Sequence, residues 1–169
     1  MKKTFLIIVS AFCTVLSFAQ SADINVEQDG TKIIKGFVTQ KEMEADPAFK
    51  WIAENKKGYT PYSTALSAVK ANKDAVHFLV FGGTWCGDTK MILPKFFSLT
   101  EAAGFSPERT TIVGVDRSKK TIHHLTETFG VTNVPTIIVL KGGKEIGRVV
   151  EYGKTGMFDK DLGEILSAK

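Results

Sequence analysis

The chain has 169 residues and a net charge of +4, with 43% apolar and 24% charged residues. This length suffices for one domain with a substantial core, and the ordinary composition excludes a chain that is disordered over most of its length. No basic stripe marks a nucleic-acid surface, so we expect no nucleic-acid partner.

Residues 1–19 have the pattern of a secretory signal peptide. Lys2 and Lys3 precede an apolar run at 5–18, and small residues stand at the positions that a signal peptidase reads. The run is too short for a comfortable transmembrane span. We therefore expect cleavage after Ala19, no stable membrane insertion afterwards, and export to the periplasm or cell envelope, or secretion. A retained membrane anchor is the alternative.

Cleavage would remove two positive charges, which leaves a net charge of +2, and one of the two cysteines, Cys13. Cys86 would then be the single cysteine, so the exported chain could form no internal disulfide. A single thiol in an exported protein is either buried and inert or reactive towards another molecule.

Residues 20–73 are expected to form an N-terminal extension of a tail and helices. Its polar start at 21–36 is typical of a tail or of an added edge strand. A short helix is predicted at 45–55. A second is predicted at 62–71, where apolar side chains lie near one helical face.

Residues 74–169 have the pattern of one α/β domain. The apolar run at 76–81 indicates a buried central strand, and Pro94 is expected to kink the helix that follows. The alternating part requires a parallel right-handed crossover, and the last two strands form a hairpin. We expect a central mixed sheet flanked by helices, built from strand 76–81, helix 88–102, strand 111–115, helix 118–129, strand 136–140, strand 145–150 and helix 157–166.

Cys86 lies after a predicted strand and at the start of the next helix. Free backbone N–H groups and the positive end of the helix dipole favour the thiolate there, and the thiolate is the nucleophile. Gly87 leaves the sulfur accessible, whereas the charge of Asp88 opposes thiolate formation. Cys86 is therefore the candidate nucleophile.

A second feature is Val134-Pro135, directly before the strand at 136–140. A proline that follows a β-branched residue at a strand entry suits a cis peptide bond.

These residues resemble the thioredoxin superfamily over about residues 75–169. The narrower pattern of residues 83–90, with 115–117 and 147–151, is similar to exported thioredoxin-like proteins of Bacteroidota that carry a Trp-Cys-Gly-Asp-Ser/Thr motif. The resemblance implies a thioredoxin fold. It is carried by Trp85-Cys86-Gly87 at the active-site start, Phe129-Gly130-Val131 and Val134-Pro135-Thr136 around the cis-proline, and Lys141-Gly142-Gly143-Lys144 at the final hairpin.

Two departures from the family pattern limit the thiol–disulfide reactions that this chain could carry out. Thioredoxins have a second cysteine three residues after the first, where this chain has Thr89. They also have a buried acid six residues before the first cysteine, where this chain has Val80. A dithiol cycle within the chain is therefore impossible. Cys86 can still attack a disulfide or a sulfenic acid and hold a mixed disulfide until an external thiol resolves it.

The resemblance implies a monothiol thiol–disulfide oxidoreductase that acts on protein or low-molecular-weight thiols and disulfides. Cys86 would be the nucleophile and Thr89 a hydrogen-bond donor to its thiolate. The expected substrate-docking residues are Trp85, Gly87, Val134 and Pro135. The alternative is a redox-inert thioredoxin-fold module that binds protein partners.

We expect a monomer without metal or cofactor. His123 and His124 are adjacent on a predicted helix, where they would point about 100° apart and could not easily ligate one ion. Asp116 and Arg117 follow a strand on the same side of the sheet as Cys86, and either contact substrate or form an ordinary salt-bridged turn.

Overall fold

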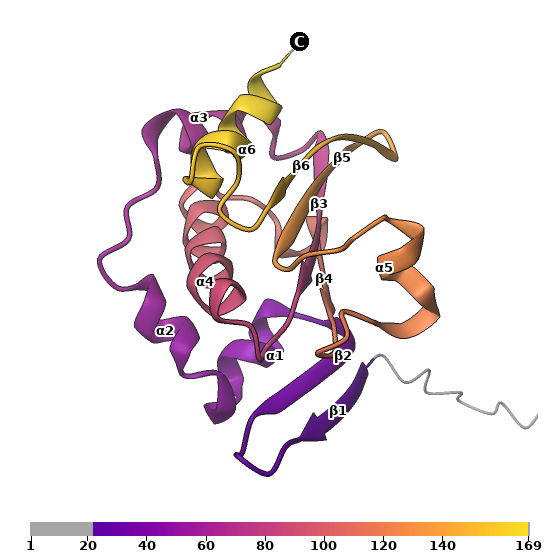
Figure 1. The fold of residues 1–169 in the computed structure, drawn as a ribbon. Coiled ribbons are helices and arrows are strands. Elements are labelled where there is room, and N and C mark those ends of the chain that lie inside the picture. Colours follow the sequence, from indigo (N-terminus) through magenta and orange to yellow (C-terminus); the bar gives the residue numbers. More distant parts are fainter. Residues whose placement is uncertain (1–21, 169) are drawn as a thin grey trace, which may run out of the picture.

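A six-stranded mixed sheet forms the centre of the structure, and helices cover both of its faces (Figure 1). The computed structural model describes residues 22–168, so the predicted signal peptide at 1–19 lies outside the described residues. Across the sheet the strand order is β1-β2-β4-β3-β5-β6. The strands are β1 (Ala22–Val26), β2 (Lys32–Val38), β3 (Val76–Gly82), β4 (Thr110–Gly114), β5 (Thr136–Lys141) and β6 (Lys144–Val150).

Most helices cover one face of this sheet, and α5 lies on the other (Figure 1). The predicted mixed sheet with helices on both faces is thus confirmed. The α-helices are α1 (Gln40–Ala45), α2 (Trp51–Lys56), α3 (Ser63–Asn72), α4 (Gly87–Ala102), α5 (Leu125–Thr128) and α6 (Phe158–Ser167), and the 3₁₀ segments are η1 (Pro47–Phe49), η2 (Pro107–Arg109) and η3 (Ile122–His124).

Strand β3 is buried on both faces, as its apolar sequence predicts. Val76, Phe78 and Val80 point into the larger core beneath the helices, whereas Leu79 and Phe81 point into the smaller core on the side of α5. The strand pairs in parallel with β4 and antiparallel with β5. Cys86 lies in the loop that follows the carboxyl end of this strand.

The N-terminal segment adds a hairpin to this sheet. Strand β1 pairs antiparallel with β2, and β2 pairs antiparallel with β4. Of the two alternatives for residues 21–36, the structure therefore has the edge strand. Thr84, just after β3, donates its hydroxyl to Lys32 O at 2.7 Å and accepts from Ile34 N at 3.4 Å. These bonds join the hairpin to the loop before Cys86.

The helix predicted at 45–55 is divided in the structure. A capping box starts α1 early, because Thr39 Oγ1 accepts from Glu42 N at 3.1 Å and Glu42 Oε2 accepts from Thr39 N at 2.8 Å. Asp46 then ends α1, and Pro47 opens the separate turn η1. Proline suits the first position of such a turn, since its missing N–H is not needed there.

The helix predicted at 118–129 is wrong for most of its length, because α5 begins only at residue 125. The Asp116 carboxylate accepts from a backbone N–H four residues later at 2.9 Å, and Thr121 donates its hydroxyl to Gly114 O at 2.7 Å. These side chains turn the backbone locally and so compete with helix formation. His123 and His124 both have a left-handed φ of 53° and do not lie on an α-helix.

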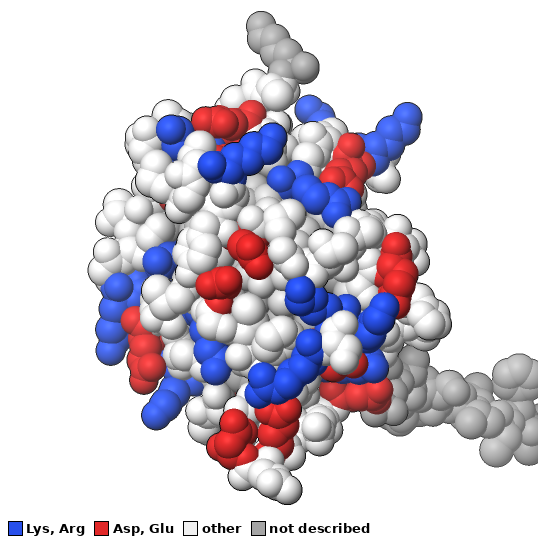
Figure 2. Space-filling model, in the orientation of Figure 1, with Lys and Arg blue, Asp and Glu red and all other residues white. Residues whose placement is uncertain are grey.

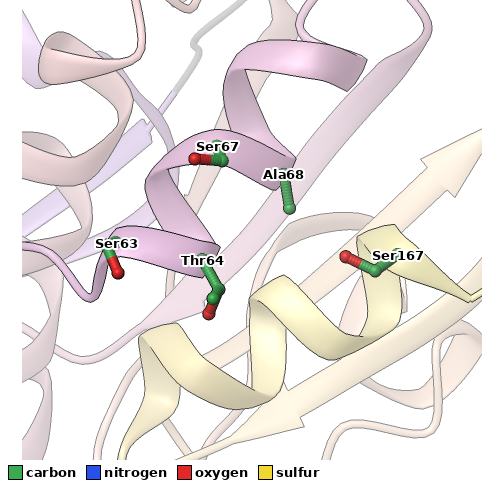
Figure 3. Close-up of a pocket in the computed structure, with 5 residues that line it drawn as sticks. All are labelled: Ser63, Thr64, Ser67, Ala68 and Ser167. Carbon is green, nitrogen blue, oxygen red and sulfur yellow. The ribbon is translucent and has the colours of Figure 1, made fainter.

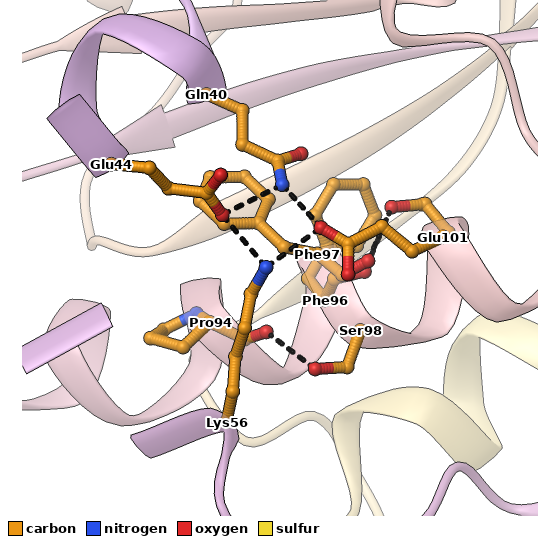
Figure 4. Close-up of polar contacts among 9 residues, drawn as sticks. Gln40, Glu44, Lys56, Pro94, Phe96, Phe97, Ser98 and Glu101 are labelled. Carbon is orange, nitrogen blue, oxygen red and sulfur yellow. Dashed lines mark hydrogen bonds and ion pairs between the residues drawn. The ribbon is translucent and has the colours of Figure 1, made fainter. Parts of the chain in front are cut away.

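Helix α4 runs through Pro94, which has no N–H to donate to the carbonyl oxygen of Lys90. Asn55 of α2 supplies the missing donor, because its Nδ2 lies 3.0 Å from Lys90 O. Ser98 Oγ in turn donates to Pro94 O at 3.2 Å (Figure 4). The N-terminal extension thus completes the hydrogen bonding of the helix that begins at Cys86.

A charge cluster also joins α1 and α2 to α4 (Figure 4). Lys56 Nζ lies 2.7 Å from both Glu44 and Glu101, and Gln40 donates to Glu44 at 2.9 Å. Burial works to lower the pKa of Lys56, but the hydrogen bonds to Glu101 and Glu44 outweigh it and raise that pKa. Lys56 therefore stays charged at neutral pH, and its two ion pairs tie the extension to the domain.

We predict that Asn55→Ala lowers the free energy of unfolding by about 1–2 kcal/mol, because it leaves the partly buried Lys90 carbonyl without its donor. In a Pro94→Ala background the helix regains its own N–H, so the same substitution should cost clearly less. Urea unfolding of the four proteins measures this double-mutant cycle. An equal cost in both backgrounds would contradict the proposed replacement.

Candidate functional site

Cys86 is the N-cap residue of the sixteen-residue helix α4. Its N–H donates to Gly83 O at 2.9 Å, and its carbonyl accepts from Lys90 N at 3.0 Å, the first bond of the helix. The side chain is partly exposed, and its sulfur forms no disulfide. Cys86 therefore stands at the end of α4 where backbone N–H groups have no partner within the helix.

The sulfur lies against Val134 and Pro135, two of the expected substrate-docking residues. Cys86 Sγ donates to Val134 O at 3.4 Å, and the Val134–Pro135 peptide bond is cis. Both residues are buried. Pro135 O accepts from Glu151 N at 2.7 Å, which ties the end of β6 to this segment. The structure therefore brings Cys86 to Val134 and Pro135, although Val134 lies 48 residues later in the chain.

Thr89 occupies the position of the absent second cysteine and is 1% exposed. Its Oγ1 accepts from Gly83 N at 3.2 Å, so the hydroxyl helps to hold the loop between β3 and α4. This bond leaves the hydroxyl hydrogen available, and its donation to the Cys86 thiolate stays a prediction.

Trp85 lies half-buried beside the thiol, with its Nε1 donating to Val115 O at 3.0 Å. The indole packs over Gly83, where an added Cβ would lie 2.7 Å from the ring. Only glycine therefore fits at this position beneath the tryptophan. Gly87 is exposed, and an added Cβ there would meet no atom within 4 Å, in keeping with open access to the sulfur.

Sequence reasoning missed Tyr152, which follows β6. Partial burial raises its pKa first, and a hydrogen bond to Asp88 and the charge of that carboxylate raise it further. Tyr152 as a whole residue is 41% exposed. The antiparallel pairing of β6 with β5 places Val150 opposite Thr136, so the chain that continues to Tyr152 leaves the sheet near Pro135.

Asp116 and Arg117 form the salt-bridged turn that was one of the two alternatives. Lys35 Nζ lies 3.1 Å from Asp116, and Arg117 pairs with Glu27. Both partners belong to the N-terminal hairpin region. Arg117 also lies over the indole of Trp85.

Other features of the surface lie apart from the thiol. Figure 2 shows lysines and arginines beside acidic residues on the face in view. A hydroxyl-rich groove between α3 and α6 is lined by Ser63, Thr64, Ser67, Ala68 and Ser167, without Cys86 (Figure 3). Within residues 22–168, no helix could cross a bilayer, and no three His, Cys, Asp or Glu side chains gather as metal ligands would.

The central strand thus presents a cysteine at a helix N-terminus opposite a cis-proline, which is the arrangement of a thioredoxin fold. The sequence profile described as Thioredoxin matches residues 59–162. The matched range therefore includes α3.

Similar proteins agree with this assignment. A thioredoxin of Echinococcus granulosus is 32% identical over 54% of this chain and 78% of its own length. Thioredoxin-2 of Saccharomyces cerevisiae is 33% identical over 56% of this chain and 81% of its own length. This chain belongs to the thioredoxin family. A Pseudomonas aeruginosa protein of unknown function has a similar fold, with a TM-score of 0.50 and 13% identity over 77% of this chain and 96% of that one.

We predict that Thr89→Val destabilises the protein by about 1–3 kcal/mol, because it leaves the buried Gly83 N–H without an acceptor. Thr89→Ser keeps the hydroxyl and serves as the matched control. Amide hydrogen exchange at Gly83 should speed up in the valine variant and stay close to that of the parent in the serine variant. The assignment of this bond fails if the two variants exchange equally.

Proposed function

We propose that this chain is an exported monothiol thiol–disulfide oxidoreductase. The observation that carries the proposal is the position of Cys86, a partly exposed thiol at the N-cap of α4 whose sulfur faces the cis Val134–Pro135 bond. Helix N-termini favour the thiolate, which is the attacking species in disulfide exchange.

The first step is attack by the Cys86 thiolate on one sulfur of a substrate disulfide. A Cys86–substrate disulfide forms, and the other substrate sulfur leaves as a thiolate. An external low-molecular-weight thiolate then attacks the Cys86 sulfur, which releases the second substrate thiolate. A second external thiolate attacks the external sulfur and frees Cys86. In sum, one substrate disulfide is reduced to two thiols, and two external thiols are oxidised to one disulfide.

The external thiol is needed because residues 22–168 contain no cysteine other than Cys86. Thr89 lies where a resolving thiol would lie, and its oxygen is already bonded to Gly83. Val80, at the position of the family's acid, is 0% exposed in the larger core. Mixed disulfides on Cys86 should therefore live long enough to be trapped.

The partners we propose are proteins or small molecules that carry accessible thiols or disulfides. We propose that the chain acts as a monomer. The partly exposed sulfur, just after the carboxyl end of β3, is open to either class of partner. Export is part of the proposal, because an oxidising compartment supplies such disulfides.

The decisive experiment compares parent and Cys86→Ser proteins in a disulfide-reductase assay with glutathione as the external thiol. We expect turnover in the parent and only the background rate of glutathione in the variant. At pH 7 the parent thiol should also react with iodoacetamide several-fold faster than free cysteine, which is only a few per cent thiolate there. Equal reductase rates would reject the redox function and favour the protein-binding module.

A second prediction concerns trapping. Parent protein incubated with oxidised substrate proteins should accumulate disulfide-linked adducts that dithiothreitol removes. Thr89→Cys should reduce that accumulation only weakly, because Val80 provides no proton acceptor for the new thiol. Non-reducing gels and mass spectrometry identify the adducts. Strong dithiol turnover in Thr89→Cys alone would show that the acid matters less than argued.

A further inference from the structure

Two contacts hold the indole of Trp85, the residue before Cys86. One is at the ring nitrogen and the other is on a face of the ring. Its Nε1 donates to Val115 O at 3.0 Å. The guanidinium carbon of Arg117 lies 5.5 Å from the centroid of the indole. That separation is within the range of a cation–π contact. Arg117 therefore covers the ring that neighbours the thiol.

Arg117 is itself held by Glu27, which lies ninety residues earlier in the chain. Arg117 Nε donates to Glu27 Oε1 at 2.7 Å, and Nη2 donates to Oε2 at 2.5 Å. A bidentate pair of this kind fixes the plane and direction of the guanidinium. The hydrogen bond from Arg117 lowers the pKa of Glu27, so the pair stays charged at neutral pH.

Glu27 has a fixed place at the end of strand β1. Its N–H donates to Thr31 O at 2.9 Å, and its carbonyl accepts from Gly30 N at 2.9 Å. Asp29 Oδ1 accepts from Thr31 N at 2.8 Å. Gly30 has a φ of +83°, which glycine adopts without strain. The turn that presents Glu27 is therefore built from its own hydrogen bonds.

The same hairpin contacts both segments that hold Trp85. Thr84, its neighbour in sequence, bonds to the backbone of β2 at Lys32. Lys35 pairs with Asp116 at 3.1 Å, one residue from the carbonyl that accepts from the indole. The hairpin thus contacts the chain on both sides of Trp85: at Thr84, the residue before it, and at Asp116, the residue after its hydrogen-bond acceptor Val115.

Global stability does not explain the Glu27–Arg117 pair. The Arg117 side chain is 52% exposed, and exposed ion pairs contribute little to folding. The effect of this ion pair is instead local, because it fixes the position of the Arg117 guanidinium over the indole.

We propose that the β1–β2 hairpin is a positioning element of the thiol site, in which Glu27 holds Arg117 against Trp85 and so sets the surface that meets the partner of Cys86. Glu27 and Arg117 are positioning residues, because they act through Trp85. The effect on substrate rests on the proposed function, whereas the effect on the indole does not.

The experiment uses a Trp51→Phe background, which leaves Trp85 as the single tryptophan. Glu27→Gln and Arg117→Met should each raise the acrylamide quenching constant of Trp85 roughly twofold, because the face of the ring becomes open to the quencher. Thermal unfolding, followed in parallel, should stay close to that of the background protein. An unchanged quenching constant in Glu27→Gln overturns the proposal.

Glu145→Gln is the matched control. Glu145 forms the same fork with Arg148, at 2.6 Å for both bonds, on strand β6. Its side chain is 33% exposed, against 27% for Glu27. The control should leave Trp85 quenching unchanged, and an equal rise there would overturn the proposal by showing a nonspecific effect of losing an ion pair.

A kinetic measurement tests the link to the partner. In the reductase assay with a protein disulfide, Glu27→Gln should raise KM roughly threefold and leave kcat unchanged. A changed quenching constant with an unchanged KM overturns the role in docking. If parent and Cys86→Ser turn over equally, the proposed redox function fails, but the quenching experiment still decides whether the hairpin positions Trp85.

Discussion

The site depends on one backbone constraint, the turn at Gly83 between β3 and α4. Its N–H donates to Thr89 Oγ1 at 3.2 Å, and its carbonyl accepts from Cys86 N at 2.9 Å. Trp85 packs so closely over it that a side chain has no room. Because all three neighbours converge on this residue, the positions of the thiol, the tryptophan and the start of α4 are set together.

The N-terminal extension completes this arrangement from several directions. It supplies the Asn55 donor that Pro94 cannot provide, and the hairpin backbone that bonds to Thr84. Lys56 adds a charged link to α4. Residues of the N-terminal extension therefore form hydrogen bonds to the helix that begins at the thiol and to the loop before it.

Much of the fold follows from sequence, because its signals are local. The apolar run of β3 and the position of Cys86 need only periodicity and a helix start. The prediction of a helix at 118–129 was wrong because the side chains of Asp116 and Thr121 form hydrogen bonds to nearby backbone groups. The spacing of apolar residues does not reveal such bonds. Tyr152 escaped notice because its proximity to Asp88 depends on the path of the chain after β6, and not on any spacing within it.

The two departures from the family pattern, Thr89 and Val80, are chemically consistent with each other. With a hydroxyl at Thr89, the Gly83 N–H has a strong acceptor, and no second thiol needs a base. Val80 can then be fully apolar, and it packs in the larger core. A cysteine at 89 would exchange that oxygen for a weaker sulfur acceptor beneath the same turn. A second thiol at 89 would therefore lack a proton acceptor at 80 and would hold the Gly83 N–H more weakly than Thr89 does.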